Sequence, residues 1–100
     1  MMGLKFEWDE VKARSNFKDH GVSFELAKTV FEDAFAIDRL DDREDYTEER
    51  FVIIGTAEGR ALLFVAYAER GERIRIISAR RATQIEQDDY FEQNASTDVH

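Results

Sequence analysis

The amino-acid sequence predicts a small α+β domain in which an antiparallel sheet packs against two N-terminal helices and one C-terminal helix. The strongest observation is a succession of three strand-forming segments, residues 50–56, 60–68 and 73–79. The turn-forming pairs Glu58-Gly59 and Arg70-Gly71 separate them, so the three segments should form an antiparallel meander. Helix-forming segments stand before and after this meander, and 100 residues suffice for only one core.

The N-terminal segment predicts a short strand followed by a surface helix. Residues 4–8 alternate apolar and polar side chains, as a half-buried strand does. Asp9 can then cap a helix over residues 10–19, which holds few apolar side chains and should lie on the surface. Gly21 suits the left-handed position that ends a helix.

Residues 23–40 predict the main core helix and a further strand. Ser23 can cap a helix through Phe31, whose apolar residues recur at the spacing of a buried helical face. Residues 34–40 alternate as a strand does and lead into the acidic segment 41–49, which we expect to be a loop. The two N-terminal strands should then join the meander in one sheet.

The C-terminal half predicts a covered sheet and a last helix. The middle strand is apolar at nearly every position from 61 to 67, so both faces of the sheet should be covered there. This strand and Phe91 also favour self-association, as in a homodimer, or contact with a partner helix. Thr83 and Glu86 fit a capping box. A single domain of residues 1–93 should precede a flexible tail, residues 94–100.

Composition narrows the compartment and the chemistry. The chain holds no cysteine, which excludes disulfides and thiolate metal sites and suits the reducing cytoplasm. Its two histidines stand far apart in the sequence, so we predict no metal site and no other cofactor. The N-terminus lacks the pattern of a secretory signal, and no run of about 18 apolar residues occurs. We therefore expect a cytoplasmic protein that does not enter a membrane.

Charge is unevenly distributed along the chain. The net charge is −8, yet residues 60–81 hold six arginines against two glutamates, whereas residues 32–49 hold nine acidic residues against two arginines. A negative net charge argues against general nucleic-acid binding, because Lys and Arg supply most of the affinity for phosphates. Two interpretations stay open: both regions are solvated faces, or the basic region binds RNA within an acidic protein.

Three patches of the sequence, spanning residues 6–90, resemble the BrnT-like toxins. The residue types, their spacing and the order of the elements agree in combination. The patches are Trp8-Asp9-x-x-Lys12-x-x-x-Asn16 with His20-Gly21-Val22-Ser23-Phe24-Glu25-x-Ala27, then Glu49-Arg50 with Ile54-Gly55, and finally Arg75-Ile76-Ile77-Ser78-Ala79-Arg80-Arg81-Ala82 with Glu86 and Tyr90.

The resemblance implies a RelE-like fold and a bacterial type II toxin, a metal-independent endoribonuclease that inhibits translation under stress. It also implies a BrnA-like antitoxin of the ribbon-helix-helix type, so that the toxin meets operator DNA only through this partner. Two features depart from the pattern: Asp19 stands where a basic residue is usual, and the chain is acidic for a ribonuclease. They favour, as the alternative, a catalytically silent module that only binds the antitoxin. An unrelated α+β interaction domain is a third interpretation.

A ribonuclease of this kind lets the 2′-hydroxyl of RNA attack the adjacent phosphate. The reaction needs a base, cations for the transition state and an acid for the leaving oxygen. Arginine suits the cationic role because its planar guanidinium binds phosphate oxygens bidentately. Arg80 and Arg50, both at strand ends, are the candidate catalytic cations. A structural role is the competing interpretation of both, for Arg80 as a salt bridge to Glu86.

His20, Glu86 and Tyr90 are the candidate groups for proton transfer. His20 could serve as an acid or a base, but beside Gly21 it can instead hydrogen-bond the free carbonyls at a helix end. Glu86 and Tyr90 lie four residues apart on one helix face, although the capping box accounts for Glu86 equally well.

Arg73, Arg75 and Arg81 are the candidate RNA-binding residues. Arg73 and Arg75 share one face of their strand, so they could follow the phosphates of an RNA strand or belong to a solvated sheet face. Trp8 fits the core better than a platform for base stacking.

Overall fold

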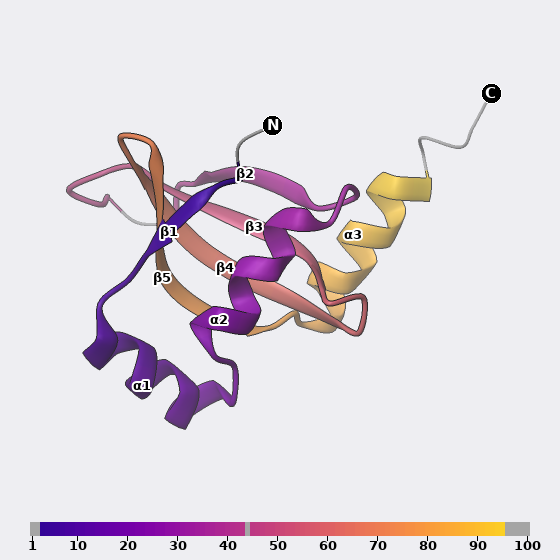
Figure 1. Ribbon diagram of the computed structural model, residues 1–100. Helices are drawn as coiled ribbons and strands as arrows, with labels where there is room; N and C mark the ends of the chain where they lie inside the picture. Colours follow the sequence, from indigo (N-terminus) through magenta and orange to yellow (C-terminus); the bar gives the residue numbers. More distant parts are fainter. Residues whose placement is uncertain (1–2, 44, 96–100) are drawn as a thin grey trace.

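The computed structural model describes residues 3–43 and 45–95. These residues form a five-stranded sheet, three α-helices and one 3-10 helix (Figure 1). In chain order the elements are β1 (Lys5–Glu7), α1 (Glu10–His20), α2 (Phe24–Ala27), η1 (Lys28–Glu32), β2 (Ile37–Asp41), β3 (Arg50–Ala57), β4 (Ala61–Arg70), β5 (Arg73–Arg81) and α3 (Gln84–Ala95). No helix in the described part of the chain is long and apolar enough to cross a membrane.

The strands follow the order β1-β5-β4-β3-β2 across the sheet. The meander of β3, β4 and β5 is antiparallel as predicted, with Ile54 opposite Phe64 and Phe64 opposite Arg80. The expectation of a wholly antiparallel sheet was wrong for β1, which pairs with β5 in parallel. These two strands are not joined by a hairpin, so no turn forces them to run in opposite directions. The sheet is therefore mixed.

Two tight connections set the register of the meander. Ala57 pairs with Ala61, and Glu58 and Gly59 between them take φ angles of 53° and 68°. The second turn lies one residue later than predicted, because Arg70 pairs with Arg73 and leaves residues 71–72 as the turn. Gly71 supplies the φ of 62° at this turn, a conformation that glycine adopts without a steric penalty.

The predicted helix over residues 23–31 changes type halfway. Ser23 caps its start by accepting a hydrogen bond from the Leu26 backbone at 3.0 Å. The α-helix ends at Ala27 and continues as η1. The hydroxyl of Thr29 donates to the Leu26 carbonyl at 2.7 Å, a local bond that competes with the regular helical pattern.

The second strand begins later and ends later than the predicted 34–40. The carboxylate of Asp33 accepts a hydrogen bond from the Phe35 backbone, and the Ala36 backbone donates to the Asp33 carbonyl. These bonds bend residues 33–36 into a turn, so β2 starts only at Ile37. It ends at Asp41, which is buried rather than part of the expected acidic loop.

The helical segment of α2 and η1 crosses one face of the sheet, and α1 lies beyond the sheet beside β5, as Figure 1 shows. The largest fully buried side chains of this core include Phe24, Val30, Leu63 and Ile76. Trp8 is half-buried against it, with its ring 5.9 Å from that of Phe24, which confirms the core interpretation of this residue.

The amide of Asn16 joins α1 to the sheet beneath this core. It donates to the carbonyls of Val22 and Ala79 at 2.9 and 2.8 Å and accepts a bond from the Ala79 backbone at 3.0 Å. The first and third sequence patches therefore meet in space, one residue before Arg80.

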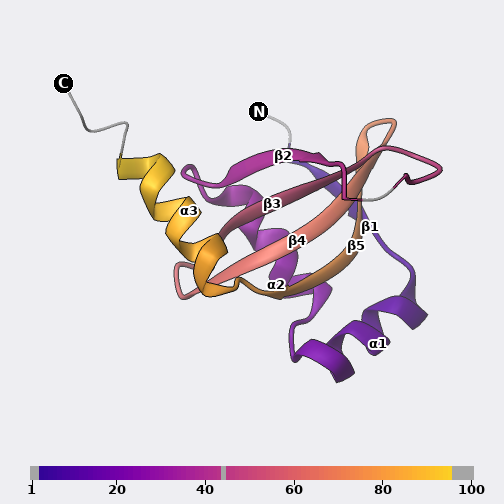
Figure 2. The same ribbon diagram turned by 180° about the vertical axis from the view of Figure 1, so that it is seen from behind.

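The opposite face of the sheet carries α3 over one end and is otherwise open to view in Figure 2. We call it the α3 face. Its core consists of Val52, Ile54, Phe64, Ala66, Ala82 and Tyr90. The helix begins with the predicted capping box, because the Thr83 backbone donates to Glu86 at 2.9 Å and the Glu86 backbone donates to Thr83 at 3.2 Å.

The last helix runs past the expected end of the domain at residue 93. Asn94 lies within α3 and donates to the carbonyls of Phe35 and Tyr90 at 3.0 and 2.8 Å. The remaining residues of the expected tail, 96–100, lie outside the described residues.

Candidate active site

Arg80 is held on the α3 face by two contacts. Its guanidinium carbon lies 4.1 Å from the ring centroid of Phe64, the residue opposite it on β4. Its Nη1 and Nη2 atoms donate to Oε1 and Oε2 of Glu86 at 2.8 and 2.9 Å. The structure thus contains the predicted salt bridge between the last strand and the last helix, and this bridge fixes the plane of the guanidinium group.

The salt bridge leaves one edge of the Arg80 guanidinium free. Glu86 takes one N–H from each terminal nitrogen, and Nη1 gives its other to the Arg81 carbonyl at 3.2 Å. Nε donates to no described residue. Because the fork is planar, the N–H of Nε and the second N–H of Nη2 point to the same side. A two-donor edge is therefore available to an oxyanion, and the side chain is 32% exposed.

The surroundings of Glu86 favour its ionised form. Burial raises the pKa of its carboxyl, but the hydrogen bonds from Arg80 and the Thr83 backbone outweigh burial, so the pKa is lowered. A carboxylate with a lowered pKa and two committed oxygens accepts a further proton poorly. Its geometry suits the positioning of Arg80 better than general base catalysis.

Arg43 is a second cation over the same aromatic ring. It is not among the candidate catalytic or RNA-binding residues predicted from the sequence. Its guanidinium carbon lies 5.2 Å from the ring centroid of Phe64. Its Nε and Nη2 atoms donate to Asp41 at 2.7 and 2.8 Å. The hydrogen bonds from Arg43 lower the pKa of Asp41 to about 2. The sequence did contain a signal for this contact. Charged residues alternate at Arg39, Asp41 and Arg43, and alternate residues of a strand point to the same face.

Arg50 lies beside this group but contacts different residues. It pairs with Asp41 across β2 and β3, and its guanidinium carbon lies 4.4 Å from the ring centroid of Tyr46. Its Nε is buried without a hydrogen-bond partner among the described residues. A cavity of about 340 Å³ adjoins it and is lined mainly by acidic side chains of residues 41–49. Arg50 is therefore a cation in an acidic surrounding.

Tyr90 is a buried residue of α3, and its hydroxyl is hydrogen-bonded to Asp33. The hydroxyl donates to Oδ2 of Asp33 at 2.7 Å, and the residue is 6% exposed. Burial and the bond to Asp33 raise the pKa of Tyr90 to about 12. The phenol is therefore directed away from Arg80 and toward the turn before β2.

His20 is the last residue of α1. It is exposed and lines a cavity of about 270 Å³ with Asn16 and Ile77. The expected capping bonds from its ring to helix carbonyls do not occur among the described residues. The cap is Gly21 alone, with a φ of 70°.

The three candidate RNA-binding arginines have different surroundings. Arg73 and Arg75 share a strand face as predicted, and both face Glu7 of β1, at 4.0 and 3.1 Å. Arg81 is exposed and forms no ion pair within the described part of the chain. It lines a cavity at the end of the sheet together with Arg60.

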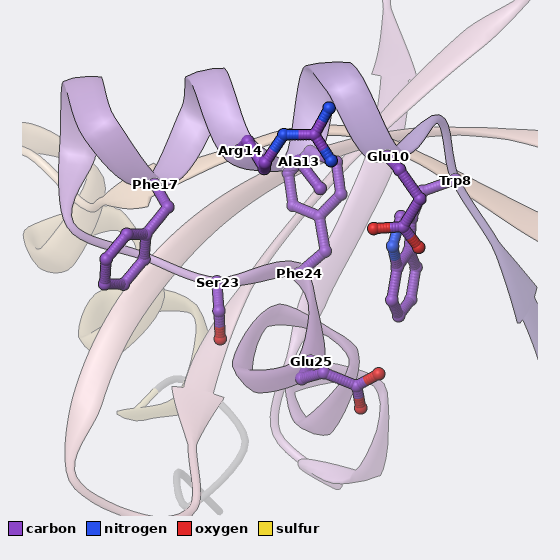
Figure 3. Close-up of a pocket in the computed structure, with 8 residues that line it drawn as sticks. All are labelled: Trp8, Glu10, Ala13, Arg14, Phe17, Ser23, Phe24 and Glu25. Atoms are coloured by element: carbon purple, nitrogen blue, oxygen red, sulfur yellow. The ribbon is translucent and has the colours of Figure 1, made fainter.

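A separate cavity of about 400 Å³ opens between α1 and the start of α2 (Figure 3). Apolar side chains and charged side chains line it together. They are Trp8, Ala13, Phe17 and Phe24, with Glu10, Arg14, Ser23 and Glu25. Its lining includes neither Arg80 nor its two contacts, Glu86 and Phe64. Among residues 3–43 and 45–95, no three His, Cys, Asp or Glu side chains gather as metal ligands would.

The fold and the α3 face define a small α+β protein in which Glu86 and Phe64 fix the guanidinium group of Arg80. Comparison with family models adds that residues 8–86 match the model described as the ribonuclease toxin, BrnT, of type II toxin-antitoxin systems. The chain therefore belongs to the BrnT family of ribonuclease toxins.

A structural comparison supports the fold. The chain resembles the crystal structure of the Brucella abortus ribonuclease toxin BrnT with a TM-score of 0.60 and 24% sequence identity. The alignment covers 82% of this chain and 100% of that one. A search of curated proteins found no match.

Proposed function

We propose that the protein is a metal-independent endoribonuclease that inhibits translation and is neutralised by a BrnA-like ribbon-helix-helix antitoxin, on a RelE-like fold. The observation that carries the catalytic part is the free two-donor edge of Arg80, fixed by Glu86 and Phe64. Membership of the BrnT family supports the RNA substrate and the antitoxin partner.

Arg80 would stabilise the phosphorane that forms when the 2′-hydroxyl attacks the adjacent phosphate. Such a transition state gathers negative charge on the phosphate oxygens, and a cation that is already oriented stabilises it without reorganisation. Arg43 would supply the second guanidinium, since both groups lie over the ring of Phe64. Glu86 and Asp41 act as positioning residues.

The proton transfers would fall to groups other than Tyr90 in this arrangement, because its hydroxyl is held by Asp33. His20, which lines a cavity together with Ile77 of the α3-face core, is the candidate to accept the proton of the 2′-hydroxyl and to protonate the leaving 5′-oxygen. Electrostatic stabilisation by oriented donors is commonly the largest catalytic contribution. A nuclease that relies on two arginines in this way needs no cofactor.

One observation favours the alternative, a catalytically silent module that binds only its antitoxin. The arginines of the α3 face are largely neutralised by the protein itself, through the pairs Arg39–Asp89, Arg43–Asp41, Arg75–Glu7 and Arg80–Glu86. The exposed Asp19 adds to the acidic surface. An RNA strand would then bind against the prevailing field of the protein.

The proposal is tested with a defined single-stranded RNA in the presence of EDTA. We expect Arg80→Ala to reduce the cleavage rate about a hundredfold or more, as loss of one oriented donor does. Arg73→Ala, whose side chain faces Glu7 and not Phe64, should lose much less. Circular dichroism of both variants checks that they are folded.

Three results would count against the proposal. Equal losses in the two variants would indicate general electrostatic attraction, and abolition of wild-type cleavage by EDTA would exclude the metal-independent mechanism. No cleavage by the wild type, alone or with ribosomes, together with tight binding of the antitoxin, would establish the silent module instead.

A further inference from the structure

The cavity beside Arg81 is the candidate for a second binding site. It measures about 510 Å³ and lies at the end of the sheet, between the β3–β4 turn and α3. The residues that line it are Thr56, Gly59, Arg60, Ala61, Leu62, Arg81, Ala82, Gln87 and Phe91. Three separate parts of the chain thus converge on it.

Its charge is unlike that of the rest of the molecule. The lining includes two arginines and no carboxylate, whereas each of the other four cavities described above or on α3 includes at least one acidic residue. The side chains of Arg60 and Arg81 form no ion pair or hydrogen bond within residues 3–43 and 45–95. In a chain of net charge −8, this cavity keeps two cations that have no partner among the described residues.

An exposed aromatic ring completes the cavity. Phe91 is 59% exposed, although it projects from the same helix as the buried Tyr90, and the two rings meet edge to face at 5.3 Å. The contact with Tyr90 holds one side of Phe91 and leaves the other side to solvent. A ring of this kind beside two cations has the composition of a single-stranded nucleic-acid site.

The cavity and the candidate active site take neighbouring residues from the same two elements, β5 and α3. Arg81 directly follows Arg80, whose Nη1 donates to the Arg81 carbonyl at 3.2 Å. Gln87 follows Glu86, and its amide donates to the Ala82 carbonyl at 3.2 Å, which joins α3 to the end of β5. When an RNA strand binds with one phosphate at Arg80, its neighbouring nucleotide would therefore lie at this cavity.

We propose that this cavity binds the nucleotide next to the cleaved bond of a single-stranded RNA, with Arg60 and Arg81 on phosphate and Phe91 stacked on a base. The proposal rests on the proposed function, because that function places the scissile phosphate at Arg80. The combination of unpartnered guanidinium groups with a ring fits a nucleotide, which offers an anion and an aromatic face together. An acidic peptide offers the anion but not the aromatic face.

The test measures binding of a fluorescent, 2′-O-methylated single-stranded RNA, which cannot be cleaved, to the full chain over a series of salt concentrations. Each lost phosphate contact lowers the dependence of log affinity on log salt by about 0.7 for a single strand. Arg60→Ala and Arg81→Ala should each show this drop. The matched control is Arg14→Ala, which removes another exposed arginine without an ion pair, at the cavity between α1 and α2.

Phe91 is tested separately from charge. Phe91→Ala should weaken RNA binding about fivefold or more while the salt dependence stays the same, because stacking releases no counterions. Phe91→Trp should restore the affinity. Inorganic polyphosphate, which has no bases, should bind wild type and Phe91→Ala equally.

The outcomes separate this inference from the proposed function. If Arg14→Ala weakens binding as much as Arg60→Ala, or if the cavity variants bind RNA normally, the inference is wrong even where the wild type cleaves RNA. If the cavity variants lose only the antitoxin, the cavity is a protein-binding site and the inference is equally wrong. If the wild type binds RNA through these residues but never cleaves it, the inference holds and the proposed catalysis fails.

Discussion

The hydroxyl of Tyr90 donates to Oδ2 of Asp33 at 2.7 Å, and this bond attaches α3 to the turn before β2. The same Asp33 oxygen accepts bonds from the backbone and hydroxyl of Thr56 in β3 at 2.8 and 3.1 Å. Three elements distant in sequence therefore meet at one carboxylate. Gly55 lies against it as well, since a Cβ there would approach Asp33 Oδ2 within 3.0 Å.

We predict that Tyr90→Phe destabilises the protein by about 1 kcal/mol, because it removes one hydrogen bond while Asp33 keeps its other donors. Asp33→Ala should cost more, since it leaves several donors without an acceptor. Urea unfolding measures both. If Tyr90→Phe left stability intact but abolished RNA cleavage, Tyr90 would be a catalytic residue after all.

Asn16 gives a second prediction. Asn16→Asp should destabilise the protein by about 3 kcal/mol, because a carboxylate cannot donate to the carbonyls of Val22 and Ala79 and would be buried beside them. Ser15→Ala, at the neighbouring exposed position, serves as the control and should change little. Equal denaturation midpoints for Asn16→Asp and the wild type would contradict this account of the contact.

Arg43 gives a prediction about the candidate active site. Arg43→Ala should reduce RNA cleavage about tenfold or more, because one of the two guanidinium groups over Phe64 is lost. Arg39→Ala removes an arginine of the same strand region that pairs with Asp89 at 2.9 Å, and should have little effect. A similar loss in both variants would show that net charge, and not the place over Phe64, is what matters.

Acid should destabilise the fold through Asp41. Its pKa in the folded chain is about 2, below the ordinary value of 3.8, chiefly because Arg43 hydrogen-bonds it. The stability from this pair is therefore complete above the ordinary pKa and is lost as the pH falls from 3.8 toward 2. Asp41→Asn should flatten the loss in this window, as measured by thermal unfolding at each pH. Asp19→Asn, at an exposed position, should retain the wild-type pH dependence.

Local signals in the sequence predicted local structure well. The cap at Asp9, the left-handed Gly21 and the capping box of Thr83 and Glu86 all occur, because each depends on residues at most a few positions apart. The antiparallel meander was equally predictable, from its turn residues and from the spacing of its apolar residues. The parallel pairing of β1 was not, since the periodicity of a short edge strand carries no information on its direction or its neighbour.

The candidate site was only partly predictable for the same reason. Arg80 and Glu86 were paired in advance because the strand and the helix are consecutive. Arg43 reaches Phe64 from a different strand, and only the folded sheet brings the two together. The hydrogen bond between Tyr90 and Asp33 spans 57 residues of sequence, so the helical spacing of Glu86 and Tyr90 could not reveal where the phenol points.

The parallel pairing of β1 with β5 also determines when the protein can fold during its own synthesis. Glu7 pairs with Arg75, and Asn16 bonds to Ala79 across 63 residues, so β1 and α1 have no sheet edge to join until β5 has left the ribosome. Arg80 and Glu86 emerge later still. A nascent chain that has not yet released β5 and α3 from the ribosome therefore contains no assembled candidate site.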